Sequence, residues 1–418
     1  MLQKARQSLN NPLAFADIIP KMESWALLRQ RKYSEVIHHL TRNYCTQDGQ
    51  FTFDPAQTFV WRHLYTAYFN LGEFHGAEQV LTYALHKNQH GGAPPSSQVL
   101  ILGYLANLAM IHNQVPTFKF YQKEILKQPH CSGFYLEAVF LLFYIVLGYK
   151  DFAQAQGYLS HLYETFSILP SIPNSWQEAM QEMERDLRLY QGDLSAIQDW
   201  LRDNQLTDAA FFKSSIGLMG IYRFSYYCFF KKDYNTALSF LNLQCEEMHN
   251  DQLWGILTDI YALRAFTHYA LGQLPEAVED LSQALKHSET QANLSWILYG
   301  LCDFRPLLEH IHLNSDLNSA FLEKVKLNLK AVQHDYTFRV APPLSFMLQQ
   351  LTEQESTIFR LLLSHQRNQD IAHHLCISMN TLKTHIRHIY KKLGVKSRKQ
   401  LKALLGNSLF HNAFTTSS

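Results

Sequence analysis

The 418-residue chain lacks the features that mark secreted, disulfide-stapled and fibrous proteins. Its six cysteines are scattered and include no C-x-x-C pair, so reduced thiols are expected rather than disulfides. Only 13 Pro and 17 Gly are present, which argues against long disorder or a collagen-like repeat. The N-terminal segment has no apolar stretch of the kind that signal peptides contain. These absences predict a folded, cytoplasmic protein.

Long hydrophobic runs are also missing. The most apolar run, residues 139–148, is about half of the roughly 20 residues that a membrane-spanning helix needs. A second candidate, residues 209–230, is interrupted by Lys213 and Arg223. Both segments are therefore expected to be buried helices, and no membrane association is predicted.

Catalytic and metal-binding motifs are equally scarce. The sequence holds no G-x-S-x-G turn, no G-x-x-x-x-G-K-[ST] phosphate loop and no G-x-G-x-x-G. Its histidines include three close pairs, His38/His39, His310/His312 and His373/His374. None of these pairs belongs to an H-E-x-x-H helix or to a Cys/His set with zinc spacing. The expectation is a protein that is not an enzyme and has no metal site and no cofactor.

Charge is balanced over the whole chain, with a formal net charge of +1, but it is unevenly distributed. Residues 351–405 hold ten Lys and Arg against three Asp and Glu, whereas the rest of the chain holds 27 against 33. A cationic C-terminal segment therefore follows a mildly anionic remainder. Such a segment is suited to polyanions, and the anionic remainder would be repelled by them.

A repeat with a period near 40 residues runs through the first three quarters of the chain. Its clearest copies read Gly72, Phe74, Ala77, Leu81, Ala84 and Gly272, Leu274, Ala277, Leu281, Ala284. In each copy a turn is followed by an aromatic or apolar residue and by small residues at helical spacing. The second helix of each hairpin is predicted to begin at or near Tyr33, Phe74, Val115, Phe152, Leu194, Tyr234 and Leu274.

This pattern predicts an α-solenoid over residues 1–330, because paired amphipathic helices bury their apolar faces only by stacking on neighbouring pairs. The segment 61–85 resembles a tetratricopeptide (TPR) repeat in its Trp61, Leu64 and Tyr68 and in the Gly72 copy given above. The period is nearer 40 than 34 residues, so longer helices are expected. The many aromatic residues are expected to fill the core, with sugar stacking on the solenoid as the alternative.

Residues 331–346, with Pro342-Pro343, are predicted to be a linker, because two consecutive prolines stop a helix. A four-helix module is predicted over residues 347–410, followed by a flexible tail at 411–418. Its helix caps can be read from the sequence. They are Thr352 with Glu355, Asn368, Ser378, and Ser397 with Gln400, and Gly394 is expected to end the third helix.

The third helix of this module has two distinct faces. Leu382, Ile386, Ile389 and Leu393 are spaced to point inward. Lys383, Thr384, Arg387 and Lys391 share the outward side, with Asn380 and Thr381 at the helix start. Lys, Arg and Thr on one helix face can read base edges in the DNA major groove. A solvated basic face is the alternative, but the order of capped helices favours DNA binding.

The same segment resembles the LuxR-type helix-turn-helix of bacterial transcription regulators. The matching positions are Leu351, Thr352, Glu355, Asn368, Ile371, Ala372, Leu375, Ile377, Ser378, Thr381, Lys383, His385, Ile389, Lys392, Leu393, Gly394, Val395 and Arg398. The resemblance implies base contacts from Lys383, Thr384 and Arg387. The sequence departs from the family pattern at Gln354, His365 and Arg367, of which Arg367 is expected to add a phosphate contact.

Phosphate contacts and a dimer contact complete the expected site. The residues expected to contact phosphate are Arg367, Asn368, Asn380, Thr381, Lys391, Lys396, Ser397 and Arg398. Some of these follow from the resemblance and others from amides and cations at helix starts, which suit phosphate. The resemblance also implies dimerisation through Leu401, Leu404 and Leu405.

A helical-repeat domain joined to this module is similar to MalT-like regulators, although the phosphate loop of their signalling ATPase is not in this sequence. The expectation is an all-α transcription regulator that binds promoter DNA as a homodimer and works with RNA polymerase. Its solenoid would sense an unknown inducer or protein partner. The alternative is a TPR-like adaptor with a vestigial DNA-binding module. A phosphorelay receiver is disfavoured because it needs alternating strands and helices.

Overall fold

The computed structural model describes residues 17–91, 95–128, 132–167, 173–203, 224–299, 302–311, 317–331, 351–364, 366–393 and 395–401. Within these ranges the regular structure is helical, apart from an isolated antiparallel bridge between Cys45 and Phe51 and a bridge residue at Cys302. The predicted all-α class is confirmed. Close contacts divide the chain into two compact units, residues 1–265 with 278–339 and residues 340–418 with 266–277.

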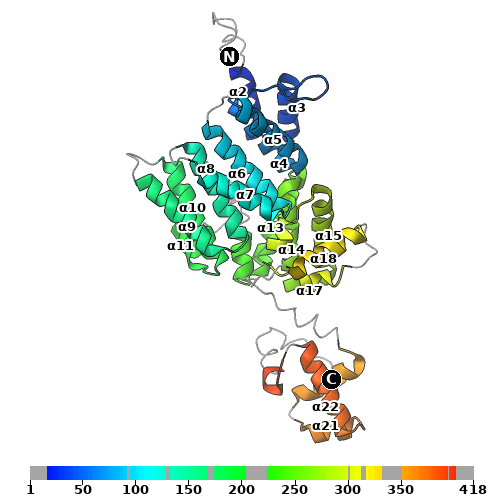
Figure 1. Cartoon of the computed structure of the whole chain (residues 1–418). Helices are drawn as coiled ribbons and strands as arrows, with labels where there is room; N and C mark the ends of the chain where they lie inside the picture. Colours follow the sequence, from blue (N-terminus) through cyan, green and yellow to red (C-terminus); the bar gives the residue numbers. More distant parts are fainter. Residues whose placement is uncertain are drawn as a thin grey trace, which may run out of the picture. The chain divides into compact units, whose positions relative to one another are not determined.

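Figure 1 shows the order of the helices along the chain. The helices before the predicted linker are α2 (Ile18–Arg29), α3 (Tyr33–Tyr44), α4 (Thr58–Leu71), α5 (Phe74–Gly91), α6 (Pro95–Ile111), α7 (Val115–Leu126), α8 (Gly133–Gly148), α9 (Phe152–Ser167), α10 (Asn174–Tyr190), α11 (Ser195–Asp203), α13 (Tyr234–Asn250), α14 (Trp254–Ala270), α15 (Leu274–Gln291), α16 (Ser295–Tyr299), α17 (Arg305–Leu308) and α18 (Ser319–Ala331). Residues 224–230 form a further helical segment before α13. The rest of the predicted linker, residues 332–346, lies outside the described residues, as does the predicted tail.

Consecutive helices of the larger unit pack as hairpins, with α2 against α3, α4 against α5, α6 against α7 and α8 against α9, and α3 packs on α4 of the next hairpin. The predicted second helices begin at the expected residues, since Tyr33, Phe74, Val115, Phe152, Tyr234 and Leu274 are the first residues of their helices and Leu194 directly precedes α11. The helix starts and the packing are therefore consistent with the expected α-solenoid.

The turn inside each hairpin has the same backbone geometry. Two positions before each predicted helix start, a residue adopts the left-handed conformation. These residues are Arg31, Gly72, Asn113, Lys150, Gly192, Lys232 and Gly272. The amide of the following residue donates a hydrogen bond to the carbonyl five residues earlier, which is the six-to-one bond of a Schellman turn. Because only three of the seven residues are glycine, the turn is maintained without a fixed residue type.

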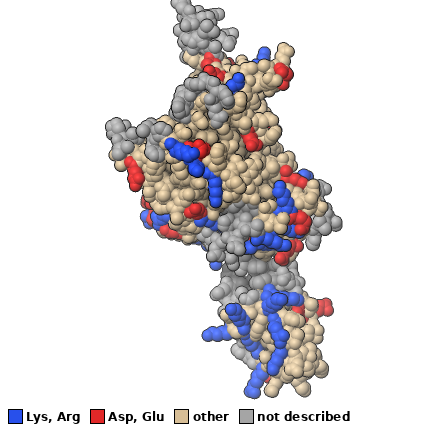
Figure 2. Space-filling model, in the orientation of Figure 1, with Lys and Arg blue, Asp and Glu red and all other residues tan. Residues whose placement is uncertain are grey.

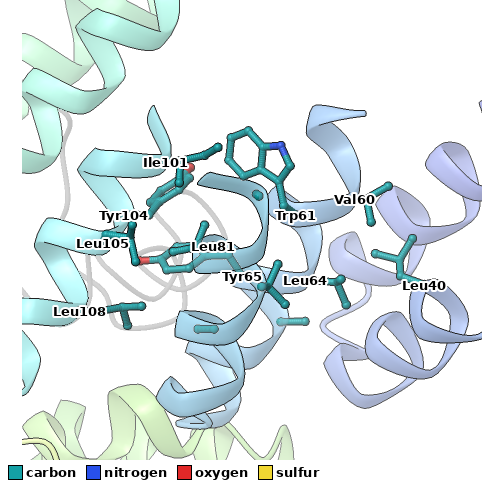
Figure 3. Close-up of a cluster of buried hydrophobic side chains, with 14 of the residues drawn as sticks. Leu40, Val60, Trp61, Leu64, Tyr65, Leu81, Ile101, Tyr104, Leu105 and Leu108 are labelled. Carbon is teal, nitrogen blue, oxygen red and sulfur yellow. The ribbon is translucent and has the colours of Figure 1, made fainter. Parts of the chain in front are cut away.

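The core around α4, α5 and α6 explains the TPR-like residues (Figure 3). Trp61 is fully buried, and its Nε1–H donates to the carbonyl of Pro55 at 3.1 Å. Tyr65 stacks on Tyr104, with ring centroids 4.1 Å apart. Leu64 lies fully buried among them. For these aromatic residues the core-filling interpretation is confirmed.

The hairpins of the larger unit do not continue in one direction, because later helices pack back against the first ones. Nη1 of Arg31, in the first turn, lies 2.7 Å from Oδ2 of Asp251, in the turn between α13 and α14. The amide of Leu294 donates to the carbonyl of Ile111 at 3.0 Å. Gly255 of α14 packs directly on the backbone at the end of α4. No pattern in the sequence predicts this return of the chain.

The C-terminal part of the smaller unit contains α20 (Glu353–Leu363), α21 (Asn368–His374) and α22 (Met379–Lys392), and residues 398–401 are helical. These helices enclose their own apolar core. Its buried members are Leu351, Ile358, Phe359, Leu362, Ile371, Ala372, Leu382, Ile386, Ile389, Leu393 and Leu401.

Candidate nucleic-acid interface

Helix α22 begins where its cap was predicted. Ser378 is the N-cap residue, and its Oγ accepts a hydrogen bond from the amide of Thr381 at 3.0 Å. The inward stripe is confirmed, since Leu382 and Ile389 are fully buried and Leu393 is 2% exposed. These contacts fix the rotation of α22 about its own axis, so that one side packs on the core and the other side faces solvent.

The opposite side of α22 carries the predicted base-reading residues. Lys383, Thr384 and Arg387 are exposed, and so is Lys391 one turn further along. The Oγ1 hydroxyl of Thr384 donates to the carbonyl of Asn380 at 3.1 Å, so its donor is used within the helix. Lys and Arg side chains gather on the visible face of the C-terminal helices, where few acidic side chains are seen (Figure 2). This face offers cationic groups to a polyanion.

At the start of α21 the predicted cap is wrong by one residue. Arg367, not Asn368, is the N-cap, and Asn368 is the first helical residue. Arg367 has an extended backbone, and its amide donates to Oδ2 of Asp370 at 3.1 Å. The third helical residue therefore supplies the capping group, whereas the prediction relied on the Asn368 side chain. Arg367 is exposed and Asn368 is half-buried.

The turn between α21 and α22 contains Cys376 and Ile377. Cys376 adopts a left-handed conformation with φ of 53° and is exposed. The amide of Ile377 donates to the carbonyl of Ala372 at 3.0 Å, which closes the end of α21. This turn orients α22 relative to α21 in the order of a helix-turn-helix.

The capping box at the start of α20 is confirmed and has a second purpose. The amide of Glu355 donates to Oγ1 of Thr352 at 3.2 Å, and Oε2 of Glu355 accepts from the Thr352 amide at 2.9 Å. The same carboxylate lies 2.6 Å from Nζ of Lys392, at the end of α22. Burial favours the neutral acid, but the hydrogen bonds from Lys392 and Thr352 outweigh it and hold the pKa of Glu355 below its usual value. No pattern in the sequence predicts this ion pair.

Arg398 has a structural role that the sequence did not predict. Its Nε donates to the carbonyl of Leu362 at 2.7 Å, Nη1 to Gln366 at 2.8 Å and Nη2 to Ser364 at 2.8 Å. These carbonyls belong to the last turn of α20 and to the residues just after it, where the helix dipole favours a cation. The guanidinium therefore ties the start of the fourth helix to the end of the first, and a phosphate contact from Arg398 stays a prediction.

The start of the fourth helix differs in detail from its predicted capping box. Oγ of Ser397 accepts from the amide of Gln400 at 3.2 Å, as expected. Oε1 of Gln400, however, accepts from the amide of Lys396 at 2.7 Å and not from that of Ser397. Gln400 thus reaches one residue further back. Lys396 and Ser397 are both exposed.

The predicted dimer contact needs a correction at Leu401. This side chain is fully buried in the core formed by α20 and α22, so it is not available to a second subunit. Leu401 lies one turn after the N-cap residue of the fourth helix, and at that position its side chain points into the core of its own domain. Leu404 and Leu405 lie outside the described residues, as do His365 and Gly394.

Among the described residues, no group of three or more His, Cys, Asp or Glu side chains is arranged to hold a metal ion. No helix in the described ranges is long and apolar enough to cross a membrane.

Residues 349–405 match the GerE family, described as bacterial regulatory proteins of the luxR family. The spore germination protein GerE of Bacillus subtilis is 42% identical over 50 residues, which is 12% of this chain and 68% of GerE. The HTH-type transcriptional regulator MalT of Vibrio cholerae is 42% identical over 50 residues, which is 12% of this chain and 6% of MalT. This chain thus covers a small part of MalT and most of GerE. The expected LuxR-type resemblance is confirmed, and the chain belongs, through its C-terminal helix-turn-helix domain, to the luxR family of bacterial regulatory proteins.

Proposed function

We propose that the protein is a DNA-binding transcription regulator whose helix α22 enters the major groove of promoter DNA. The observation that carries this proposal is the exposed set Lys383, Thr384 and Arg387, on the face of α22 opposite the buried stripe. Lys and Arg can donate to guanine O6 and N7, and the Thr methyl can contact a thymine methyl. Because α22 is held in rotation by its core, these side chains present a fixed pattern to the bases.

Phosphate contacts would position α22 in the groove. The residues proposed for them are Arg367, Asn368, Asn380, Thr381, Lys391, Lys396 and Ser397. All but Asn368 are exposed. Arg398 would support this set by fixing the fourth helix, because its donors point at the α20 carbonyls. Such contacts fix the register on the duplex without reading its sequence.

The larger unit is proposed to receive the signal, as a small ligand or a protein, in the cytoplasm. Binding as a homodimer on two half-sites would match the symmetry usual for helix-turn-helix regulators. Contact with RNA polymerase is part of the same proposal. Packed helical hairpins offer extended surfaces and internal cavities, which supports a receiving role.

The proposal is tested by DNA binding of the full chain to duplexes selected from a random library. Lys383→Ala is expected to weaken the selected site by roughly 1 to 3 kcal/mol and to relax its base preference. Lys324→Ala is the matched control, since Lys324 is an exposed lysine of α18. Lys396→Ala is expected to weaken all duplexes alike and to reduce the salt slope by about one.

Equal affinity of the Lys383→Ala and Lys324→Ala chains for the selected site would contradict the docking of α22. Failure of the wild-type chain to select any duplex, with no steep salt dependence, would favour the adaptor alternative.

A further inference from the structure

Where the chain returns, the larger unit contains a partly open cavity of about 380 Å³. The early helices α4, α5, α6 and α8 form one part of its lining. Helices α10 and α14 and the segment that follows α15 form the other part. Aromatic side chains form much of the wall, including Phe69, Tyr190 and Trp296. This volume lies within the range of small-molecule sites in proteins.

Among the described residues that line this cavity, Asp259 of α14 is the single charged one. Each of the two amide side chains of the wall has one polar atom bonded to the protein. Nδ2 of Asn107 donates to the hydroxyl of Tyr65 at 3.1 Å, and Oδ1 of Asn293 accepts from Oγ of Ser295 at 2.8 Å.

Asp259 itself is partly buried and, within the part of the chain that the structure describes, forms no hydrogen bond or ion pair. Burial raises the pKa of its carboxyl to about 7. An ionised carboxylate without a partner in such a place is unfavourable, and a ligand cation would relieve that cost.

The aromatic rings that line the same cavity as Asp259 indicate the same kind of ligand. A cation is attracted to the face of an aromatic ring, and cages of such rings bind organic ammonium groups. A neutral polyol would need several free hydrogen-bonding groups, whereas Nδ2 of Asn107 and Oδ1 of Asn293 already have partners in the protein. Charge and wall composition therefore favour a cation over a neutral ligand.

We propose that this cavity is the ligand site of the larger unit and binds a small organic ammonium ion, with the carboxylate of Asp259 as its counter-ion and the aromatic rings around it. This assignment rests on the proposed signal-receiving role and names the chemical class of the signal. A bound ligand would also connect early and late helices of the larger unit, because it would touch residues of α4 and of α14 at once.

The test is calorimetric binding to the full chain at pH 8 with two probe cations, tetramethylammonium and 2-phenylethylammonium. The neutral control is 2-phenylethanol. At least one cation is expected to bind, Asp259→Asn to weaken it at least tenfold, and the alcohol to bind wild type and variant alike. Asp259→Glu keeps the charge and is expected to retain binding better than Asp259→Asn, which separates loss of charge from misfolding.

The pH dependence gives a second readout. Tetramethylammonium is charged at every pH, so its affinity is expected to fall about tenfold from pH 8 to pH 6 as Asp259 takes up a proton. The other ionisable groups of the described lining are three tyrosines and Cys302, and burial raises the pKa of the Cys302 thiol to about 12. They therefore do not account for a change in this range.

Absence of binding by both cations, equal binding by Asp259→Asn, or tighter binding of the alcohol would each overturn the inference. The Lys383→Ala chain distinguishes this failure from failure of the DNA proposal, because it is expected to bind the cation as wild type does.

Discussion

The carboxylate of Glu355 lies 2.6 Å from the ammonium of Lys392. The first residue belongs to the first turn of α20 and the second ends α22. Glu355 is 5% exposed at its side chain and Lys392 is 33% exposed, so the pair is shielded on one side only. The proposed DNA-reading helix is thus held at its far end by the cap of another helix.

Glu355→Gln is expected to destabilise the C-terminal helices by about 2 kcal/mol at pH 7, because Lys392 loses its anionic partner. The depressed pKa of Glu355 means that its contribution is present at neutral pH and is lost as pH falls below the ordinary value of 4.5. The difference between wild type and variant should therefore shrink in acid. Amide hydrogen exchange of α20 and α22 measures the destabilisation at pH 7 and its decrease in acid. Exposed Glu353→Gln is the control. A difference that grows in acid would be inconsistent with the ion pair.

Arg398→Ala is expected to destabilise the same helices by about 2 to 3 kcal/mol, because the carbonyls after α20 lose their donors. Arg398→Lys keeps the charge but not the forked donors, so it should recover little. The measurement is hydrogen exchange at the end of α20. The neighbouring exposed Lys399→Ala should change stability by less than about 0.5 kcal/mol. Unchanged exchange in Arg398→Ala, with weakened DNA binding, would assign the side chain to phosphate instead.

Gly255→Ala is expected to destabilise the larger unit by about 2 kcal/mol, because the added Cβ would overlap the carbonyl oxygen of Phe69. The control is Gly157→Ala in α9, where no heavy atom lies within 4 Å of an added Cβ. That change should stabilise by about 0.5 to 1 kcal/mol through helix propensity. Denaturant unfolding followed by Trp fluorescence reports on this unit, since all six Trp precede residue 300. Equal effects of the two substitutions would argue against the close approach of α14 to α4.

Asp259→Asn is expected to stabilise the unliganded protein at pH 8, by about 1 to 2 kcal/mol after allowance for partial exposure. The folded protein holds the Asp259 proton up to about pH 7, well above the usual 3.8, so wild-type stability falls as pH rises between these values. Below pH 4 the two proteins should be alike. Thermal unfolding from pH 4 to 8 measures this, with exposed Asp48→Asn as control. A constant difference across the range would contradict a buried, unpaired carboxyl.

The sequence predicted local features of the fold well. Turn, aromatic and alanine spacing placed the start of α5 at Phe74 and of α13 at Tyr234, because Schellman turns and amphipathic helices depend on residues a few positions apart. The caps at Thr352 and Ser378 were predicted for the same reason.

Contacts between distant residues were not predictable in this way. The pairs Arg31–Asp251 and Glu355–Lys392 leave no periodic signal in the sequence. Arg398 was read as a phosphate ligand because cations at a helix start commonly have that role, and its carbonyl partners lie more than thirty residues away. Leu401 was assigned to a dimer by resemblance, whereas core packing decides where a leucine points.

The return of the chain described for Arg31 and Asp251 also bears on how the larger unit folds. In a linear array each repeat is stabilised by its neighbours alone, and the ends can unfold separately. Here the first turn is joined to one 220 residues later, so neither end is free to fray without loss of contacts at the other. Such a connection lengthens the mean loop that must close and slows folding. We expect the repeats to unfold in one cooperative transition, unlike those of an open array.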